Sequence, residues 1–128
     1  MSKSRNLADI VRLLETQMGF STIADPGNAG AISVSSSGHC QITSGGAGHT
    51  RTVAIPTFEG QVLTLDHDVD GGTAIVTFAS NINTRGDDKV TLTNAGDFIT
   101  VKSVNNSGTL AWRVIGGSLA AGLDSILS

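Results

Sequence analysis

The chain has 128 residues, of which 16 are glycine, 39% are hydrophobic and only 15% are charged, and its formal net charge is −3. This length fits one domain, and a hydrophobic chain with so small a net charge is not expected to be disordered. Because eight Lys and Arg residues stand against eleven Asp and Glu residues, the composition also disfavours a polybasic nucleic-acid binder.

The first predicted element is a short amphipathic α-helix near the N-terminus. Gly19 supplies a stop, and Ser4 or Asn6 is suited to cap the start. A helix of about 12 residues is marginal by itself, so its apolar face needs a surface to cover it. That surface belongs either to the same β-domain or to a neighbouring molecule. The face consists of Leu7, Ile10, Val11, Leu14 and Met18.

A loop, Ser21 to Gly30, follows, and then the chain reads as strand after strand. Alternating residues and β-branched side chains dominate these runs, and clusters of Gly, Asn and Asp separate them at intervals of roughly 8–12 residues. The predicted strands, about eight in number, are Ala31–Ser35, His39–Thr43, Thr50–Ile55, Gln61–Asp66, Thr73–Ser80, Lys89–Thr93, Phe98–Ser103 and Thr109–Ile115.

This pattern predicts an all-β fold behind the N-terminal helix. Short strands without intervening helices favour an antiparallel β-sandwich or barrel, jelly-roll-like, over a parallel α/β sheet. Many of the alternating positions are Thr, Ser or Ala, so the core is thin, and oligomerisation is the usual remedy. The predicted core anchors are Phe58, Phe78, Phe98 and Trp112.

The chain is expected to divide into three segments. Residues 1–30 form a helix and an arm for assembly, residues 31–117 the β-domain, and residues 118–128 an apolar tail. The tail is either a short helix or a docking segment. Its Leu119 and Leu123, together with the apolar face of the N-terminal helix, are the candidate assembly contacts.

The segment from Asp66 to Gly71 resembles the first half of an EF-hand loop, because oxygen ligands alternate before a glycine. The bidentate Glu that such a loop needs at its twelfth position is replaced by Thr77. We therefore expect a polar loop after the preceding strand, with a weak cation site at Asp66–Asp70 as the alternative.

No other motif predicts catalysis, a metal or a cofactor. His39, Cys40 and His49 lack the spacing of a metal site, and with one cysteine no disulfide can form within the chain. A Gly-x-Ser-x-Gly elbow is absent, and Gly45–Gly48 lacks the Lys-Ser/Thr of a phosphate loop. Arg85–Asp87 matches a cell-adhesion tripeptide by letter and is expected to be an ordinary turn. We therefore expect no enzyme.

No signal peptide or membrane segment is predicted either. Asp9, Arg12 and Glu15 interrupt the N-terminal apolar residues, and no window approaches the roughly 18 apolar residues that a span requires. Together with the single cysteine, this fits assembly in a reducing cytoplasm.

The second half of the chain contains several distinctive short runs: Gly60–Leu65, Gly71–Thr73, Val76–Ala79, Val90–Asp97, Ile99–Val104 and Leu110–Gly117. These runs resemble a β-module of tailed-bacteriophage virion proteins, found in capsid decorations, head fibres and tail fibres. The resemblance covers about Pro56 to Gly117, and the opening Ser4–Asp9 is similar to the start of many marine phage structural proteins.

The resemblance implies a structural, often trimeric, all-β protein without catalytic residues. The expectation is a capsid decoration (cement) protein, assembled in the host cytoplasm and located on the capsid surface of the virion. Its partners would be the major capsid protein and copies of itself, and it would bind each lattice neighbour through apolar area and strand edges. The alternative is a short fibre or fibre-tip protein that binds a host receptor or glycan, against which one Trp and no Tyr argue.

Overall fold

The structure, a computed structural model, describes residues 21–118 and 127–128. These residues contain strands and connecting loops without a helix, so the all-β prediction is confirmed for this part of the chain. The predicted N-terminal helix lies outside the described residues. The strands are β1 (Thr22–Ile23), β2 (Gly30–Ile32), β3 (Gly38–Ser44), β4 (His49–Val53), β5 (Val62–Asp70), β6 (Ala74–Phe78), β7 (Lys89–Leu92), β8 (Phe98–Asn106) and β9 (Thr109–Gly117).

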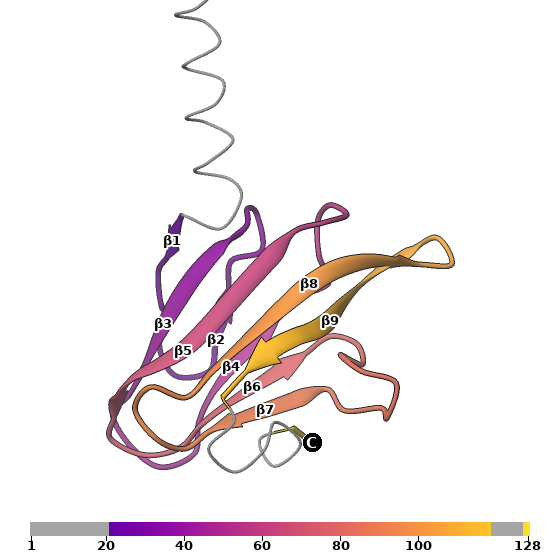
Figure 1. Cartoon of the computed structure of the whole chain (residues 1–128). Helices are drawn as coiled ribbons and strands as arrows, with labels where there is room; N and C mark the ends of the chain where they lie inside the picture. Colours follow the sequence, from indigo (N-terminus) through magenta and orange to yellow (C-terminus); the bar gives the residue numbers. More distant parts are fainter. Residues whose placement is uncertain (1–20, 119–126) are drawn as a thin grey trace, which may run out of the picture.

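The strands form two layers (Figure 1). One sheet has five strands in the order β1-β3-β5-β8-β9, and the other has four in the order β2-β4-β6-β7. Each of the first six strands lies in the opposite sheet from the strand before it. The chain therefore winds as a coil, in which each turn adds one strand to each sheet.

This winding makes the neighbouring strands of the coil parallel. β1, β3 and β5 pair in parallel, as do β2, β4 and β6. Thr22 pairs with His39, 17 positions further on, and His39 pairs with Thr64, 25 positions further on. Parallel strands need a long connection between them, and here the strand in the other sheet and its two flanking turns provide it.

The expected antiparallel sandwich or barrel is therefore corrected to two open, mixed sheets. Among the named strands, antiparallel pairing is found for β6–β7 and for β5–β8–β9. The predicted spacing of turns is retained, but most turns connect the two sheets instead of neighbouring strands of one sheet. Gly, Asn and Asp suit both kinds of turn, so the turn residues alone cannot reveal the strand direction.

The core lies between the sheets, where the inward residues of the strands meet. Trp112 and Phe78 are buried there as predicted, and the Trp112 indole donates a hydrogen bond to the Ala54 carbonyl at 2.8 Å. Phe58 and Phe98 are 42% and 39% exposed, so their prediction as core anchors is wrong. Phe98 precedes the buried Ile99 and therefore points outward, whereas Phe58 lies on the loop between β4 and β5.

The turns of successive coils stack tightly at one end of the molecule. A Cβ atom on Gly71 would lie 2.3 Å from the Ser44 carbonyl oxygen, and one on Gly72 would lie 2.5 Å from the Ala47 nitrogen. Gly72 also has a φ of 150°, which L residues rarely adopt. The glycines therefore allow one turn to approach the backbone of the next.

Candidate functional site

Within the described residues, the charged contact with the most hydrogen bonds joins the turn after β1 to β4. Arg51 of β4 is fully buried, and its Nε donates to Asp25 Oδ1 at 2.6 Å while its Nη2 donates to Asp25 Oδ2 at 3.0 Å. The guanidinium also donates to the carbonyl oxygens of Thr50 and Thr43, at 2.9 and 3.0 Å. A buried cation is tolerated here because a bidentate carboxylate and two carbonyls solvate it.

Asp25 is correspondingly held in its charged form. Its pKa falls from 3.8 to about 2, chiefly because of the Arg51 hydrogen bond; burial opposes this fall, and hydrogen bonds from the Thr43 and Gly27 amides add to it. The turn Asp25–Gly27 brings the carboxylate into this position, with the Gly27 amide 3.2 Å from Oδ1. The site is therefore a structural ion pair.

Asp25 and Arg51 also occupy the edge of β3. β1 pairs only with His39 and Cys40 of the longer β3. Further along, the Thr43 amide donates to Asp25 Oδ2 at 3.0 Å and the Thr43 carbonyl accepts from Arg51. Side chains thus replace the strand that would otherwise pair there.

Residues of the same turn also form hydrogen bonds with the edge of β4 that β2 does not cover. The Thr50 amide donates to Asn28 Oδ1 at 3.0 Å, and the Thr50 carbonyl accepts from the Ala29 amide at 2.8 Å. Since exposed strand edges invite pairing with other chains, the turn between β1 and β2 limits strand addition at the parts of β3 and β4 that these two strands leave unpaired.

Gln61 organises the loops at the other end of the molecule. Its buried amide nitrogen donates to the carbonyl oxygens of Val34 and Ser36, at 2.8 and 3.0 Å. Its carbonyl oxygen accepts from the Thr57 amide at 2.9 Å, while the Thr57 hydroxyl donates to the Val34 carbonyl at 2.9 Å. Both amide hydrogens and the carbonyl of the side chain are thus paired, so the two loops before β3 and β5 are held together.

Ser44 and His67 form a pair that superficially resembles a catalytic dyad. Ser44 Oγ lies 2.8 Å from His67 Nε2 and donates to the Gly72 carbonyl. Because its proton is directed to Gly72, the hydroxyl accepts from His67, which leaves the other ring nitrogen, Nδ1, buried without a hydrogen-bond partner. Both side chains are fully buried, so the pair ties β3 and β5 to the turn before β6 and offers no accessible nucleophile.

The Asp66–Asp70 segment is not the predicted polar loop. It is the end of β5, where His67 faces the core and the side chain of Asp66 bonds to His39 on the neighbouring strand. Asp68 is exposed. Among the described residues, no group of three or more His, Cys, Asp or Glu side chains could hold a metal ion.

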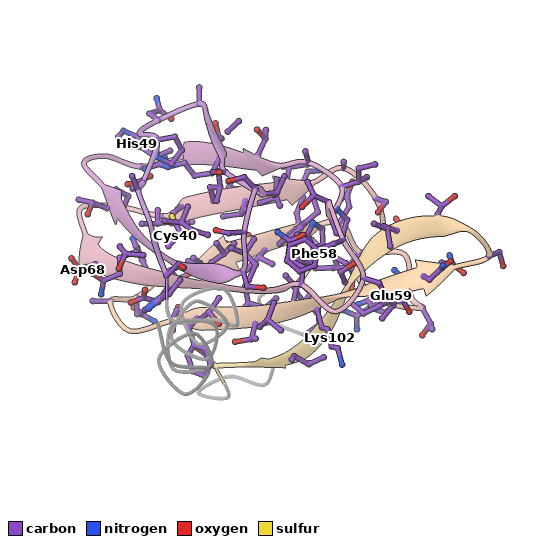
Figure 2. The ribbon with its side chains drawn as sticks, turned by 90° about the horizontal axis from the view of Figure 1, so that it is seen from above. Cys40, His49, Phe58, Glu59, Asp68 and Lys102 are labelled. Carbon is purple, nitrogen blue, oxygen red and sulfur yellow. The ribbon has the colours of Figure 1, made fainter. Side chains whose placement is uncertain are left out.

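The remaining candidates do not gather at one place. Burial raises the pKa of the Cys40 thiol to about 11, so the thiol stays protonated at neutral pH. His49 Nδ1 accepts a hydrogen bond from the Gly45 amide at 3.3 Å. Figure 2 places His49 and Asp68 toward one side of the molecule, and Phe58 with Glu59 toward the other.

The Arg85–Asp87 tripeptide is self-paired. The Arg85 guanidinium donates to Asp87 Oδ2, and Asn83 Nδ2 donates to the same oxygen at 2.8 Å. These two contacts, with that of Asn83 the larger, lower the pKa of Asp87. Because the opposite charges engage each other, the tripeptide is a closed turn, as expected.

The predicted assembly contacts Leu7, Ile10, Val11, Leu14, Met18, Leu119 and Leu123 all lie outside the described residues. Exposed apolar side chains elsewhere were not predicted as contacts. Within residues 21–118 and 127–128 the large ones are Ile55, Phe58, Phe98 and Ile115, and Ile115 is the most exposed at 58%.

Sequence reasoning missed Asp25, Arg51 and Gln61 as organising residues. A signal was present in the run Thr50-Arg51-Thr52-Val53, because alternation places Arg51 on the same face as Val53. An inward arginine requires a carboxylate, but the alternation does not identify which of the acidic residues supplies it.

No family model, curated protein or solved structure matches this chain. In the part of the chain that the structure describes, no helix has the length and apolar character needed to cross a membrane.

Proposed function

We propose that the chain is a structural protein of a tailed-bacteriophage virion: a capsid decoration (cement) protein that binds the capsid surface as a homotrimer and stabilises the shell. Each copy bridges neighbouring subunits of the major capsid protein. The contribution is mechanical, because area buried between subunits opposes their separation.

The observation that carries the proposal is the arrangement of the phage-like runs. Three of them, Gly60–Leu65, Ile99–Val104 and Leu110–Gly117, occupy β5, β8 and β9. These strands are adjacent and antiparallel within one sheet. Motifs separated in the chain thus form one continuous unit, which supports a shared module over a chance similarity of separate strands.

Exposed apolar side chains provide further support. Phe98 and Ile115 project from β8 and β9 of this unit, and Ile55 and Phe58 from the loop before β5. Such residues gain free energy when a neighbour covers them. Contacts from side chains block parts of the β3 and β4 edges. We therefore place the main contacts with neighbours on the exposed apolar side chains and not on those edges.

Sedimentation and capsid binding test this function directly. The full chain is expected to sediment as a trimer and to bind expanded capsids of its phage from which the decoration protein has been removed. Bound protein should raise the temperature at which these capsids release their DNA. A monomer that fails to bind such capsids would overturn the proposal.

One observation favours the alternative, a short fibre or fibre-tip protein. Phe98 is exposed on the outer face of its sheet, pairs with Asp66, and lies near the hydroxyl pair of Thr64 and Thr100, whose oxygens are 3.0 Å apart. An aromatic ring beside polar groups suits a sugar. Binding of the isolated protein to host cells or glycans, lost in Phe98→Ala, would rank this function first.

A further inference from the structure

The edge of β7 is occupied by the two residues Leu127 and Ser128, from elsewhere in the chain. Leu127 forms an antiparallel bridge with Val90. Ser128 and Lys89 exchange backbone hydrogen bonds of 2.9 and 2.8 Å, and the Asp88 amide also donates to the Ser128 carbonyl, at 2.9 Å. We call Leu127 and Ser128 the clip.

The clip combines backbone pairing with a buried side chain. Leu127 is only 9% exposed and belongs to the hydrophobic core that includes Val90. These are the two components of recognition by strand addition, in which the ladder supplies binding and the side-chain contact supplies specificity. The β7 edge is thus built to receive an extended segment with a leucine.

The partly uncovered stretches of the inner strands β3 and β4, and the outer strand β9, are treated differently. Asp25 and Arg51 saturate Thr43 of β3, and Asn28 and Ala29 saturate Thr50 of β4. At β9, the Val114 amide donates to the Ile82 carbonyl at 3.0 Å, and Arg113 donates to the Trp112 carbonyl at 2.9 Å. Neighbouring loops and side chains thus occupy these places, whereas at β7 a remote segment does so.

The clip is tethered to the last strand by a short segment of chain. Ser118 is fixed beside Phe98, since its amide donates to the Phe98 carbonyl at 2.9 Å and its hydroxyl accepts from the Phe98 amide at 2.7 Å. Residues 119–126 separate Ser118 from the clip. Eight residues can span at most about 29 Å when extended.

We propose that the β7 edge binds the clip of a second copy, so that copies of the chain are joined by exchange of Leu127 and Ser128. In a closed ring each copy gives one clip and receives one, which leaves no β7 edge empty. The contacts within each site are the same as in the single chain, so exchange adds connection between copies without a new recognition surface. This rests on the self-association proposed above and adds a second contact to that of the exposed apolar side chains.

Cysteine pairs distinguish exchange from the closed arrangement within one copy. In a Cys40→Ser background, one preparation carries Lys89→Cys and another carries Ser128→Cys. The two positions exchange backbone hydrogen bonds, a spacing that suits a disulfide. The preparations are mixed, oxidised and separated on a denaturing gel without reductant, after a parallel sedimentation run.

Exchange predicts a disulfide-linked band at twice the chain mass in the mixture. The matched control adds Leu127→Asp to the Ser128→Cys copy, which removes the buried anchor, and the band should then be lost while circular dichroism shows that the sheet remains. The double variant Lys89→Cys/Ser128→Cys in one chain reports closure within a copy.

The possible outcomes separate the two proposals. A trimer in sedimentation without the linked band, or a band that survives Leu127→Asp, overturns exchange and leaves self-association standing. A double variant that links only within single chains also overturns exchange. A monomer throughout overturns both.

Discussion

Buried polar side chains form hydrogen bonds that link successive turns of the chain around the two sheets. Arg51 brings together Asp25, Thr43 and Thr50, which lie on three different segments of the chain. Because the guanidinium is fully buried, removal of its partner leaves a charge without compensation. Changes at such residues should therefore cost more than changes at exposed charges.

Stability should depend on acid through Asp25. Its pKa is 3.8 when unfolded and about 2 when folded, so the ion pair stabilises the fold above pH 4 and this contribution is lost as the pH falls through about 2. The shift corresponds to about 2 kcal/mol of the free energy of unfolding. Urea unfolding between pH 5 and pH 2 measures it.

The matched variants are Asp25→Asn and Asp88→Asn. Asp25→Asn should be destabilised by roughly 3 kcal/mol near neutral pH, because Arg51 stays buried, and should show a flatter acid dependence. Asp88 is 3.9 Å from Lys89 at the surface, and its variant should keep the dependence of the parent. An unchanged slope in Asp25→Asn would contradict the assignment.

Gln61 offers a second test at this scale. Gln61→Leu keeps most of the volume but leaves the Val34 and Ser36 carbonyls and the Thr57 amide without this partner. We expect the free energy of unfolding to fall by roughly 2–4 kcal/mol, because unpaired buried groups are costly. The exposed Gln41 provides the control, since Gln41→Leu should change stability by less than about 0.5 kcal/mol.

At the scale of elements, the turns between the sheets decide how closely the coils stack. Gly71→Ala would bring its Cβ within 2.3 Å of the Ser44 carbonyl oxygen. Neither backbone can move without disturbing β3 or β5, so we expect a loss of roughly 2–4 kcal/mol in thermal or urea unfolding.

Gly116→Ala is the control for this turn. A Cβ there meets nothing within 4 Å, and φ is not in the region that favours glycine. This variant should be within about 0.5 kcal/mol of the parent. Equal effects of the two substitutions would contradict the stacking argument.

Alternation was sufficient to predict most strands but not their partners. In β5 and β8 the inward residues, such as Leu63, Leu65 and Val101, follow the period of two that defines a face. β1 was missed because a strand of two residues is too short to show a period. Strand direction was mispredicted because it depends on which sheet a turn enters, and that choice is made by contacts between distant residues.

The sequence pattern predicted some residues of the candidate site but not their structural setting. A run of alternating Asp residues in Asp66–Asp70 suggested a loop with possible ligands, yet the segment continues β5 and presents His67 to the core. Polar strand residues look like loop residues when their buried partners, here Ser44, are far apart in the chain. Pairing across 23 positions is outside the reach of a local pattern.

For the whole molecule, exposed apolar side chains should control association. Phe98→Ser and Ile115→Ser remove two of them from the unit formed by β5, β8 and β9. If neighbours cover these side chains, the double variant should dissociate at protein concentrations at least roughly tenfold higher than the parent, equivalent to about 1.4 kcal/mol. Analytical ultracentrifugation over a dilution series measures this.

Thr93→Ser serves as the surface control, because Thr93 is exposed in the turn after β7. It should associate like the parent. If the double variant keeps its association state and its melting temperature, the neighbour covers other parts of the surface and the interface must be moved away from β8 and β9.

The coil also determines how a protein of this kind can change in length. Each complete turn supplies one strand to both sheets and returns the chain to the same end, so a whole turn inserted between β4 and β5 would preserve every inward and outward face. A single inserted strand would instead reverse the sheet to which all later strands belong. The protein can therefore lengthen only by whole turns, in the direction in which strands lie side by side within each sheet. The antiparallel strands β7 to β9 close one end of this stack, and the Asp25–Arg51 pair lies toward the other.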